Sequence, residues 1–112
     1  MRTIRSSAEI DRLFREGTRA THPLLVVLVS PAPAACPGGR VAFVAGRKLG
    51  GAVARNRAKR VLREACRRAG GPWDGLDAVL IARAATGAAS PADLDAALAG
   101  ALRRVSGRGD AA

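Results

Sequence analysis

Residues 55–68 read Arg55-Asn56-Arg57-Ala58-Lys59-Arg60-Val61-Leu62-Arg63-Glu64-Ala65-Cys66-Arg67-Arg68. On a helix of 3.6 residues per turn, this segment has one apolar stripe, which consists of Ala54, Ala58, Val61, Leu62 and Ala65. The opposite side carries Asn56, Lys59, Arg60, Arg63 and Arg67. The pattern predicts a helix that packs through the apolar stripe and presents a cationic ridge on its other side.

The positive charge of the chain is concentrated around this helix. Residues 47–68 contain nine basic residues and one acid, whereas residues 69–112 contain four basic residues and five acids. Like charges on one helix face repel one another, so the ridge indicates an external polyanion rather than a solvated helix without a partner. The only aromatic residues are Phe14, Phe43 and Trp73, so we expect phosphate contacts rather than base stacking to dominate binding.

The predicted helix follows a glycine-rich turn, Gly46-Arg47-Lys48-Leu49-Gly50-Gly51. Free backbone amides and the helix dipole make such a helix start a favourable environment for phosphate. The turn is not a nucleotide-triphosphate loop, because no Gly-Lys-Ser/Thr follows a four-residue spacer.

The flanking sequence predicts two further helices. Ser6 and Glu9 have the spacing of a capping box, and Gly17 is expected to end the first helix in a left-handed conformation. Its predicted buried stripe consists of Ile10, Leu13 and Phe14. The last helix begins after Ser90, with Pro91 at its first position, and is expected to fray from Gly107.

Strands are predicted at residues 24–29, 40–45 and 77–82, whereas residues 18–22 fit a short strand or an extended lead-in. The second of these strands is expected to run antiparallel to the first. The basic helix, placed between the second and third, provides the crossover of a β-α-β unit. We therefore predict an α+β fold, with a small, mainly antiparallel sheet, element order αβββαβα, and a single domain over residues 1–112.

The chain has few residues suited to catalysis or metal binding. It has one histidine, His22, and no tyrosine, and its acids are scattered over both flanks. Cys36 and Cys66 show no C-x-x-C spacing, which favours two free thiols in a reducing cytoplasm. The amino-terminal residues lack an apolar signal segment, and the run at residues 24–29 is too short to span a bilayer. These residues indicate a cytoplasmic RNA- or DNA-binding domain, with no catalytic site, bound metal or membrane partner of its own.

A longer motif extends the interpretation. Residues 46–65 read Gly46-Arg47-Lys48-Leu49-Gly50-Gly51-Ala52-Val53-Ala54-Arg55-Asn56-Arg57-Ala58-Lys59-Arg60-Val61-Leu62-Arg63-Glu64-Ala65, and this run resembles the signature of the bacterial ribonuclease P protein component. Residues 5–17 look like the opening helix of that family, and residues 77–83 look like its late strand. The resemblance covers about residues 4 to 105 and implies a single RNA-binding domain over residues 1–112.

The resemblance implies a protein subunit of a ribonucleoprotein that removes the 5′ leader from precursor tRNA. The catalytic centre and its Mg²⁺ ions would then belong to the RNA subunit, and this chain would have no cofactor and no small-molecule substrate. Its partners would be the catalytic RNA, bound by the basic helix, and the single-stranded leader, held in a cleft between the first helix and the sheet. The family also has a left-handed β-α-β crossover.

The resemblance assigns site residues by position. Those expected to bind RNA are Arg47, Lys48, Arg55, Asn56, Arg57, Lys59, Arg60, Arg63 and Arg67. Phe14 matches an aromatic of the leader cleft, whereas Ile10 and Leu28 stand where family members often have aromatic residues. We therefore expect weaker base stacking on the leader and a larger share of phosphate contacts.

Two other classes of protein share some of these features. A ribosomal or other RNA-binding module without an enzyme partner would also carry a basic helix. A sequence-specific DNA-binding protein needs a recognition helix after a short helical turn, whereas here a strand and a glycine-rich turn precede the helix.

Overall fold

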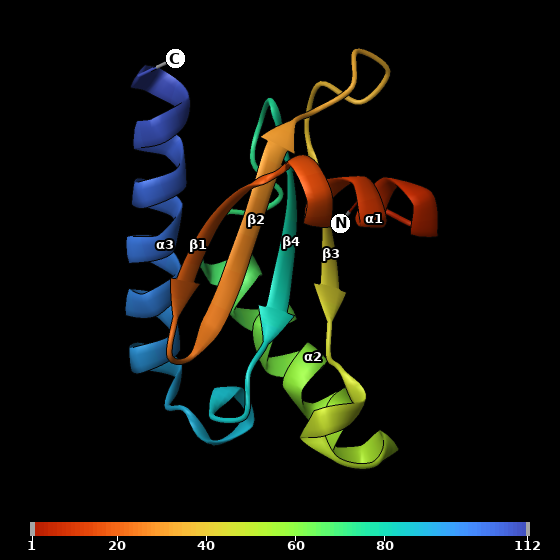
Figure 1. Cartoon of the computed structure of the whole chain (residues 1–112). Coiled ribbons are helices and arrows are strands. Elements are labelled where there is room, and N and C mark those ends of the chain that lie inside the picture. The colour runs from red at the N-terminus through yellow and green to blue at the C-terminus, as the bar shows by residue number, and fades with distance from the viewer. Residues whose placement is uncertain (1, 112) are drawn as a thin grey trace.

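The computed structural model describes the backbone of residues 2–111 and the side chains of residues 2–105. Its elements follow the predicted order αβββαβα and form one α+β unit (Figure 1). The helices and strands are α1 (Ser7–Glu16), β1 (Thr18–His22), β2 (Leu25–Pro31), β3 (Arg40–Val44), α2 (Ala52–Arg68), β4 (Leu76–Ala82) and α3 (Pro91–Ala111). Two short 3-10 turns, η1 (Arg47–Leu49) and η2 (Thr86–Ala88), precede α2 and α3.

The four strands form one mixed sheet in the order β1-β2-β4-β3. β1 pairs antiparallel with β2, β2 pairs antiparallel with β4, and β3 pairs parallel with β4. The sheet is therefore mainly antiparallel, as predicted. β3 does run opposite to β2, but β4 lies between the two strands, an insertion that local sequence patterns do not predict.

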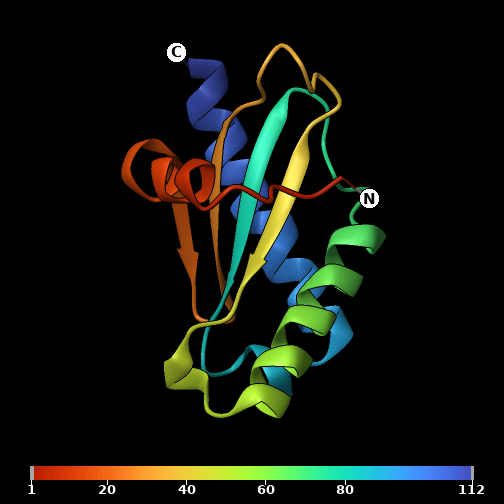
Figure 2. The ribbon, with the colours of Figure 1, turned by 90° about the vertical axis from the view of Figure 1, so that its right-hand side faces the viewer.

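The β3-α2-β4 crossover has the rare left hand. In Figure 1 both strands point downward, β3 lies to the right of β4, and α2 passes behind the sheet. The view turned by 90° places α2 on the side of the sheet away from α1 (Figure 2). About 98% of such connections are right-handed, and a right-handed path would have put α2 on the face that α1 covers. The left-handed path instead places α2 beside α3.

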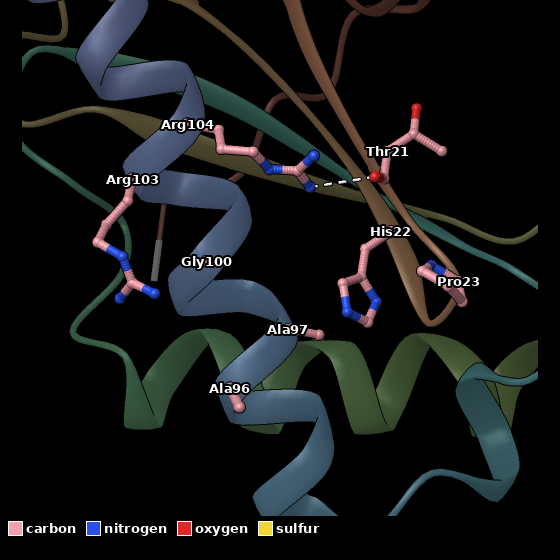
Figure 3. Close-up of a pocket in the computed structure, with 8 residues that line it drawn as sticks. All are labelled: Thr21, His22, Pro23, Ala96, Ala97, Gly100, Arg103 and Arg104. Carbon is pink, nitrogen blue, oxygen red and sulfur yellow. Dashed lines mark hydrogen bonds between the residues drawn. The ribbon is translucent and has the colours of Figure 1, made fainter.

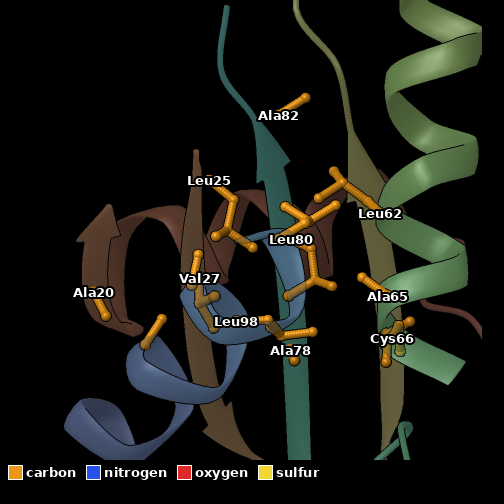
Figure 4. Close-up of a cluster of buried hydrophobic side chains, with 14 of the residues drawn as sticks. Ala20, Leu25, Val27, Leu62, Ala65, Cys66, Ala78, Leu80, Ala82 and Leu98 are labelled. Carbon is orange, nitrogen blue, oxygen red and sulfur yellow. The ribbon is translucent and has the colours of Figure 1, made fainter. Parts of the chain in front are cut away.

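The sheet separates two apolar clusters. Residues from α2 and α3 meet β1, β2 and β4 in the larger cluster, where Leu62, Leu80 and Leu98 have no exposed surface (Figure 4). On the other face, α1 covers a smaller cluster that consists of Ile4, Leu13, Leu28, Ala42 and Val79. Burial of these side chains is the main source of the fold's stability.

Only one of the two hydrogen bonds of the predicted capping box of α1 is present. Ser6 caps the helix, and its Oγ accepts a hydrogen bond from the Glu9 backbone N–H at 3.4 Å. The Glu9 carboxylate binds Arg40 of β3 instead of returning to the cap. Gly17 has extended backbone angles (φ −69°, ψ 154°), so the predicted left-handed stop is wrong. The chain leaves α1 directly into β1, and a Cβ at Gly17 would lie 2.5 Å from the Leu13 carbonyl oxygen.

The carboxyl-terminal helix is longer than predicted. α3 begins at Pro91, as expected, and the Ser90 hydroxyl accepts a hydrogen bond from the Asp93 backbone N–H. The helix continues to Ala111 instead of fraying from Gly107. Glycine weakens a helix interior but does not end it on its own.

A charged cluster joins α1 to the two parallel strands. Arg40 and Asp77 are register partners on β3 and β4, and the Arg40 guanidinium donates two hydrogen bonds to the Asp77 carboxylate, at 2.6 and 3.1 Å. Asp77 is 1% exposed. The same guanidinium also binds Glu9. The hydrogen bond from Arg40 lowers the pKa of Glu9, and the bonds to Asp77 and Glu9 raise the pKa of Arg40.

Removal of the buried carboxylate is expected to destabilise the fold strongly. We predict that Asp77→Ala lowers the free energy of unfolding by about 3 kcal/mol, because it leaves the Arg40 charge largely buried with one partner fewer. Urea unfolding followed by circular dichroism measures the loss. Glu16→Ala is the matched control, since Glu16 forms an exposed pair with Arg12 at 3.8 Å, and we expect it to cost less than about 1 kcal/mol. Equal losses in the two variants would show that the Arg40 cluster is not a stabilising contact.

The two cysteines are both free, as predicted, but they differ in burial. Cys66 lies in the larger apolar cluster with no exposed surface, and burial raises its pKa to about 11. Cys36 is half-buried in the β2–β3 loop. We predict that a thiol reagent at pH 8 labels Cys36 in the folded protein and reaches Cys66 only after denaturation, because the thiolate is the reactive species. Cys36→Ser is expected to abolish labelling of the folded protein. Labelling of the folded protein that persists in this variant would contradict the burial of Cys66.

Candidate nucleic-acid interface

The buried side of α2 consists of Ala58, Leu62, Ala65 and Cys66. The predicted stripe was therefore correct at its centre, but it omitted Cys66 and included Ala54, which is exposed. The first turn of α2 extends beyond the sheet, as Figure 2 shows, so apolar residues there have nothing to pack against.

Most of the predicted RNA-binding residues lie on the exposed side of α2 and on η1. The exposed ones are Arg47, Lys48, Asn56, Arg57, Arg60, Arg63 and Arg67. Arg55 and Lys59 are half-buried. Eight of these side chains are cationic, and no acidic residue lies between Arg47 and Arg63 in the sequence.

The two flanks of α2 differ in what their arginines contact. On the flank toward α3, the Arg57 Nε donates to the Gly87 carbonyl oxygen at 3.1 Å, and Arg68 binds both carboxylate oxygens of Asp95. Hydrogen bonds to Asp95 raise the pKa of Arg68. Arg57, predicted only as an RNA contact, therefore also fixes η2 against α2. Glu64 lies four residues before Arg68 in the sequence and could pair with it on a helix, but no signal in the sequence indicated the pairing of Arg68 with Asp95 of α3.

The other flank faces β3 and forms the cationic ridge. The Arg63 guanidinium lies over the Phe43 ring, 5.3 Å from its centroid, which is a cation–π contact. This contact holds Arg63 beside the edge strand while leaving the guanidinium exposed. Arg60 and Arg67 lie on the same side of the helix, one turn before and after Arg63.

The amino-terminal end of α2 is open to an anion. Gly51 occupies the cap position, no side chain caps the helix, and the first helical hydrogen bond runs from the Arg55 N–H to the Gly51 carbonyl. Gly50 precedes it at φ 116°, a conformation that favours glycine. The amides of the first turn thus lack a side-chain acceptor, and Arg47 and Lys48 lie close by in the sequence. This geometry suits a phosphate group.

Val53 is a surface feature that sequence reasoning missed. Its side chain is 85% exposed, in the first turn of α2 among the cationic residues. The signal was present, because Val53 falls opposite Leu62 on a helical projection. An exposed branched side chain here can pack against a ribose or a base beside the phosphate contacts.

The three predicted cleft residues differ in accessibility. Phe14 is 40% exposed on α1, and Ile10 is half-buried beside the smaller apolar cluster. Leu28 has no exposed surface, so the expectation that it faces the leader is wrong. It lies in the middle of β2 under α1, and the alternation of strand residues cannot show where a helix covers a sheet.

The described residues contain no group of three or more His, Cys, Asp or Glu side chains that could hold a metal ion. Within the same residues, no helix is long and apolar enough to cross a membrane. An exposed cationic helix, an uncapped helix start and a small mixed sheet together define a nucleic-acid-binding α+β protein.

Comparison with known sequences gives the family. The family model described as Ribonuclease P matches residues 1–106. A Dehalococcoides mccartyi protein named ribonuclease P protein component is 40% identical over 87 residues, which cover 78% of this chain and 70% of that protein. The chain belongs to the ribonuclease P protein family. Other matches are shorter: an Acidothermus cellulolyticus protein of the same name is 40% identical over 60 residues, and the match spans half of its length.

Solved structures confirm the fold. The RNase P protein from Thermotoga maritima superposes with a TM-score of 0.77 at 27% identity, covering 94% of this chain and 98% of that one. The Staphylococcus aureus RNase P protein gives the same TM-score at 23% identity, covering 92% and 94%. The α+β class and element order predicted from the sequence are thereby confirmed.

Arg60 and Arg63 provide a direct test of the cationic ridge. If both contact phosphates, Arg60→Ala/Arg63→Ala lowers the slope of log affinity against log salt by about 0.7 to 0.9 per lost contact. Titration of labelled catalytic RNA at several salt concentrations measures the slope. Arg12→Ala/Arg15→Ala, which removes the same charge from exposed positions on α1, is the control. If the slope falls by the same amount in the two double variants, the ridge makes no specific contacts.

Proposed function

We propose that this chain is the protein component of ribonuclease P and assists a catalytic RNA in removing the 5′ leader from precursor tRNA. The observation that supports the proposal most directly is the exposed cationic side of α2, which carries the motif through which the chain resembles this family. The names of the relatives agree with the proposal.

The proposal divides the work between protein and RNA. Hydrolysis of a phosphodiester bond needs metal ions or paired acid-base groups. Within the described residues, the buried Asp77 binds Arg40 and the partly exposed Asp95 binds Arg68. The resemblance to the family assigns the chemistry to the RNA, with Mg²⁺ ions that the RNA would hold. The protein would bind and orient the RNA, and we expect it to do so in the cytoplasm.

Two surfaces would share the binding. The cationic ridge and the open start of α2 neutralise phosphates of the catalytic RNA, and the repulsion among their own charges is relieved on binding. The leader would lie along α1 beside the partly exposed Phe14. With Leu28 buried and Ile10 aliphatic, this second surface offers a single aromatic ring for stacking, so phosphate contacts should dominate leader affinity.

A reconstitution experiment tests the proposal. Precursor tRNA is incubated at low Mg²⁺ with the protein alone, with the matching catalytic RNA alone, and with both. We expect cleavage at the mature 5′ end that requires the RNA and that the protein strongly increases.

Two results would contradict the proposal. If the protein leaves the rate of the RNA unchanged, the chain is better described as a ribosomal or other RNA-binding module. If the purified protein cleaves alone, the division of work between protein and RNA is wrong.

A further inference from the structure

Three adjoining hollows cross the end of the molecule where β4 leads into η2 and the β1–β2 turn meets α3. The first, of about 350 Å³, lies between the start of α2 and η2 and is lined by Arg57, Arg83 and Gly87. The second, of about 400 Å³, lies between the β4–η2 segment and the β1–β2 turn. It shares Arg83 with the first hollow.

The third hollow, of about 660 Å³, lies between the β1–β2 turn and α3 (Figure 3). It shares Thr21, His22 and Pro23 with the second hollow. Arg104 reaches from α3 across this hollow and donates to the Thr21 carbonyl oxygen at 3.0 Å. The three hollows therefore adjoin one another, from the first turns of α2 to the middle of α3.

Every charged side chain among the described residues that line this path is basic. Arg57, Arg83, Arg103 and Arg104 follow one another along it. Arg83 is exposed, and in the described part of the chain its side chain has no hydrogen bond or ion pair. Arg103 folds back along α3, with a guanidinium nitrogen 3.8 Å from the position of a Cβ on Gly100.

His22 adds a neutral donor at the centre of the path. Its Nδ1 accepts a hydrogen bond from the Leu24 backbone N–H at 3.0 Å. The neutral ring therefore carries its proton on Nε2, which is left to donate to a ligand. Small residues such as Pro23, Ala84, Ala97 and Gly100 line the walls and would let a chain of phosphates come close.

The path is basic although the sequence around it is not. Residues 69–112 contain four basic residues and five acids, but none of the acids is among the described residues that line the path. Asp77 is buried against Arg40, and Asp95 binds Arg68 at the other end of α2. Three of the four basic residues line the path instead.

We propose that this path, from Arg57 through Arg83 and His22 to Arg104, is a second RNA-binding track that holds a phosphodiester backbone. It is separate from the cationic ridge, which lies on the opposite flank of α2 toward β3. Arg57 belongs to the predicted RNA-binding set, and its contact with η2 places it at the beginning of the track. The inference deepens the proposed function and rests on it, because either the catalytic RNA or the body of the precursor tRNA supplies the same phosphate chemistry.

The test uses Arg83→Gln/Arg104→Gln in the full-length protein. Affinity for the catalytic RNA alone is measured over a range of salt concentrations, and so is affinity of the reconstituted holoenzyme for tRNA without a 5′ leader, so that the surface on α1 that would hold the leader is not engaged. Loss of two phosphate contacts lowers the slope of log affinity against log salt by about 1.4 to 1.8. Arg12→Gln/Arg15→Gln is the matched control for the general loss of charge.

The two measurements identify the RNA. A reduced slope in the first assigns the track to the catalytic RNA, and a reduced slope only in the second assigns it to the tRNA body. Slopes equal to those of the control in both would overturn the track while leaving the proposed function intact, whereas failure of the unaltered protein to bind catalytic RNA would overturn both. If the Arg104 substitution unfolds the protein, Arg83→Gln alone is used for the test, because this change removes no side-chain hydrogen bond or ion pair among the described residues.

Discussion

The architecture depends on one charged contact, the pairing of Arg40 with Asp77 across two parallel strands. Each residue lies opposite the other in the β3–β4 register, and Glu9 brings α1 to the same guanidinium. A one-residue slip of β3 against β4 would turn Arg40 to the other face of the sheet, into the apolar cluster under α2 and α3, and would separate it from Asp77. The pair thus specifies register, although the desolvation of both groups offsets much of its contribution to stability. Gly39, at φ 83°, leads into Arg40, and a Cβ there would lie 2.0 Å from the Trp73 carbonyl oxygen.

The abundant arginines fall into two groups with different roles. Arg40 and Arg68 are held by carboxylates, and Arg57 by a carbonyl oxygen, so each joins separate elements of the fold. Arg60, Arg63 and Arg67 lie on the exposed ridge, where charges of the same sign crowd together. Folding therefore uses some cations for internal contacts and presents the others to solvent, where only an external anion relieves their repulsion. The same chain composition serves both purposes because α2 has two chemically distinct flanks.

The sequence predicted correctly those features that depend on residues close together in the chain. The apolar stripe of α2, the caps at Ser6 and Ser90 and the strand residues follow from periodicity and turn chemistry. It failed where distant segments meet. Insertion of β4 between β2 and β3, burial of Leu28 under α1 and the pairing of Arg68 with Asp95 depend on tertiary contacts that no window of residues contains. The left hand of the crossover came only from the family resemblance, because general preferences predict the opposite. The second track was missed for the same reason, since its residues come from four separate segments.

The first residues of the chain complete the sheet. Ile4 donates its N–H to the Val41 carbonyl, and Val41 donates to the Arg2 carbonyl, so a short extended segment runs along the outer side of β3. An unprotected edge strand is a template on which a second molecule can add its own strand, and this is a common beginning of aggregation. Here the chain's own amino-terminal segment pairs with that edge at Val41 of β3, beside the cationic ridge. Repulsion between molecules of net charge +10 and the partial cover of β3 at Val41 therefore both oppose aggregation.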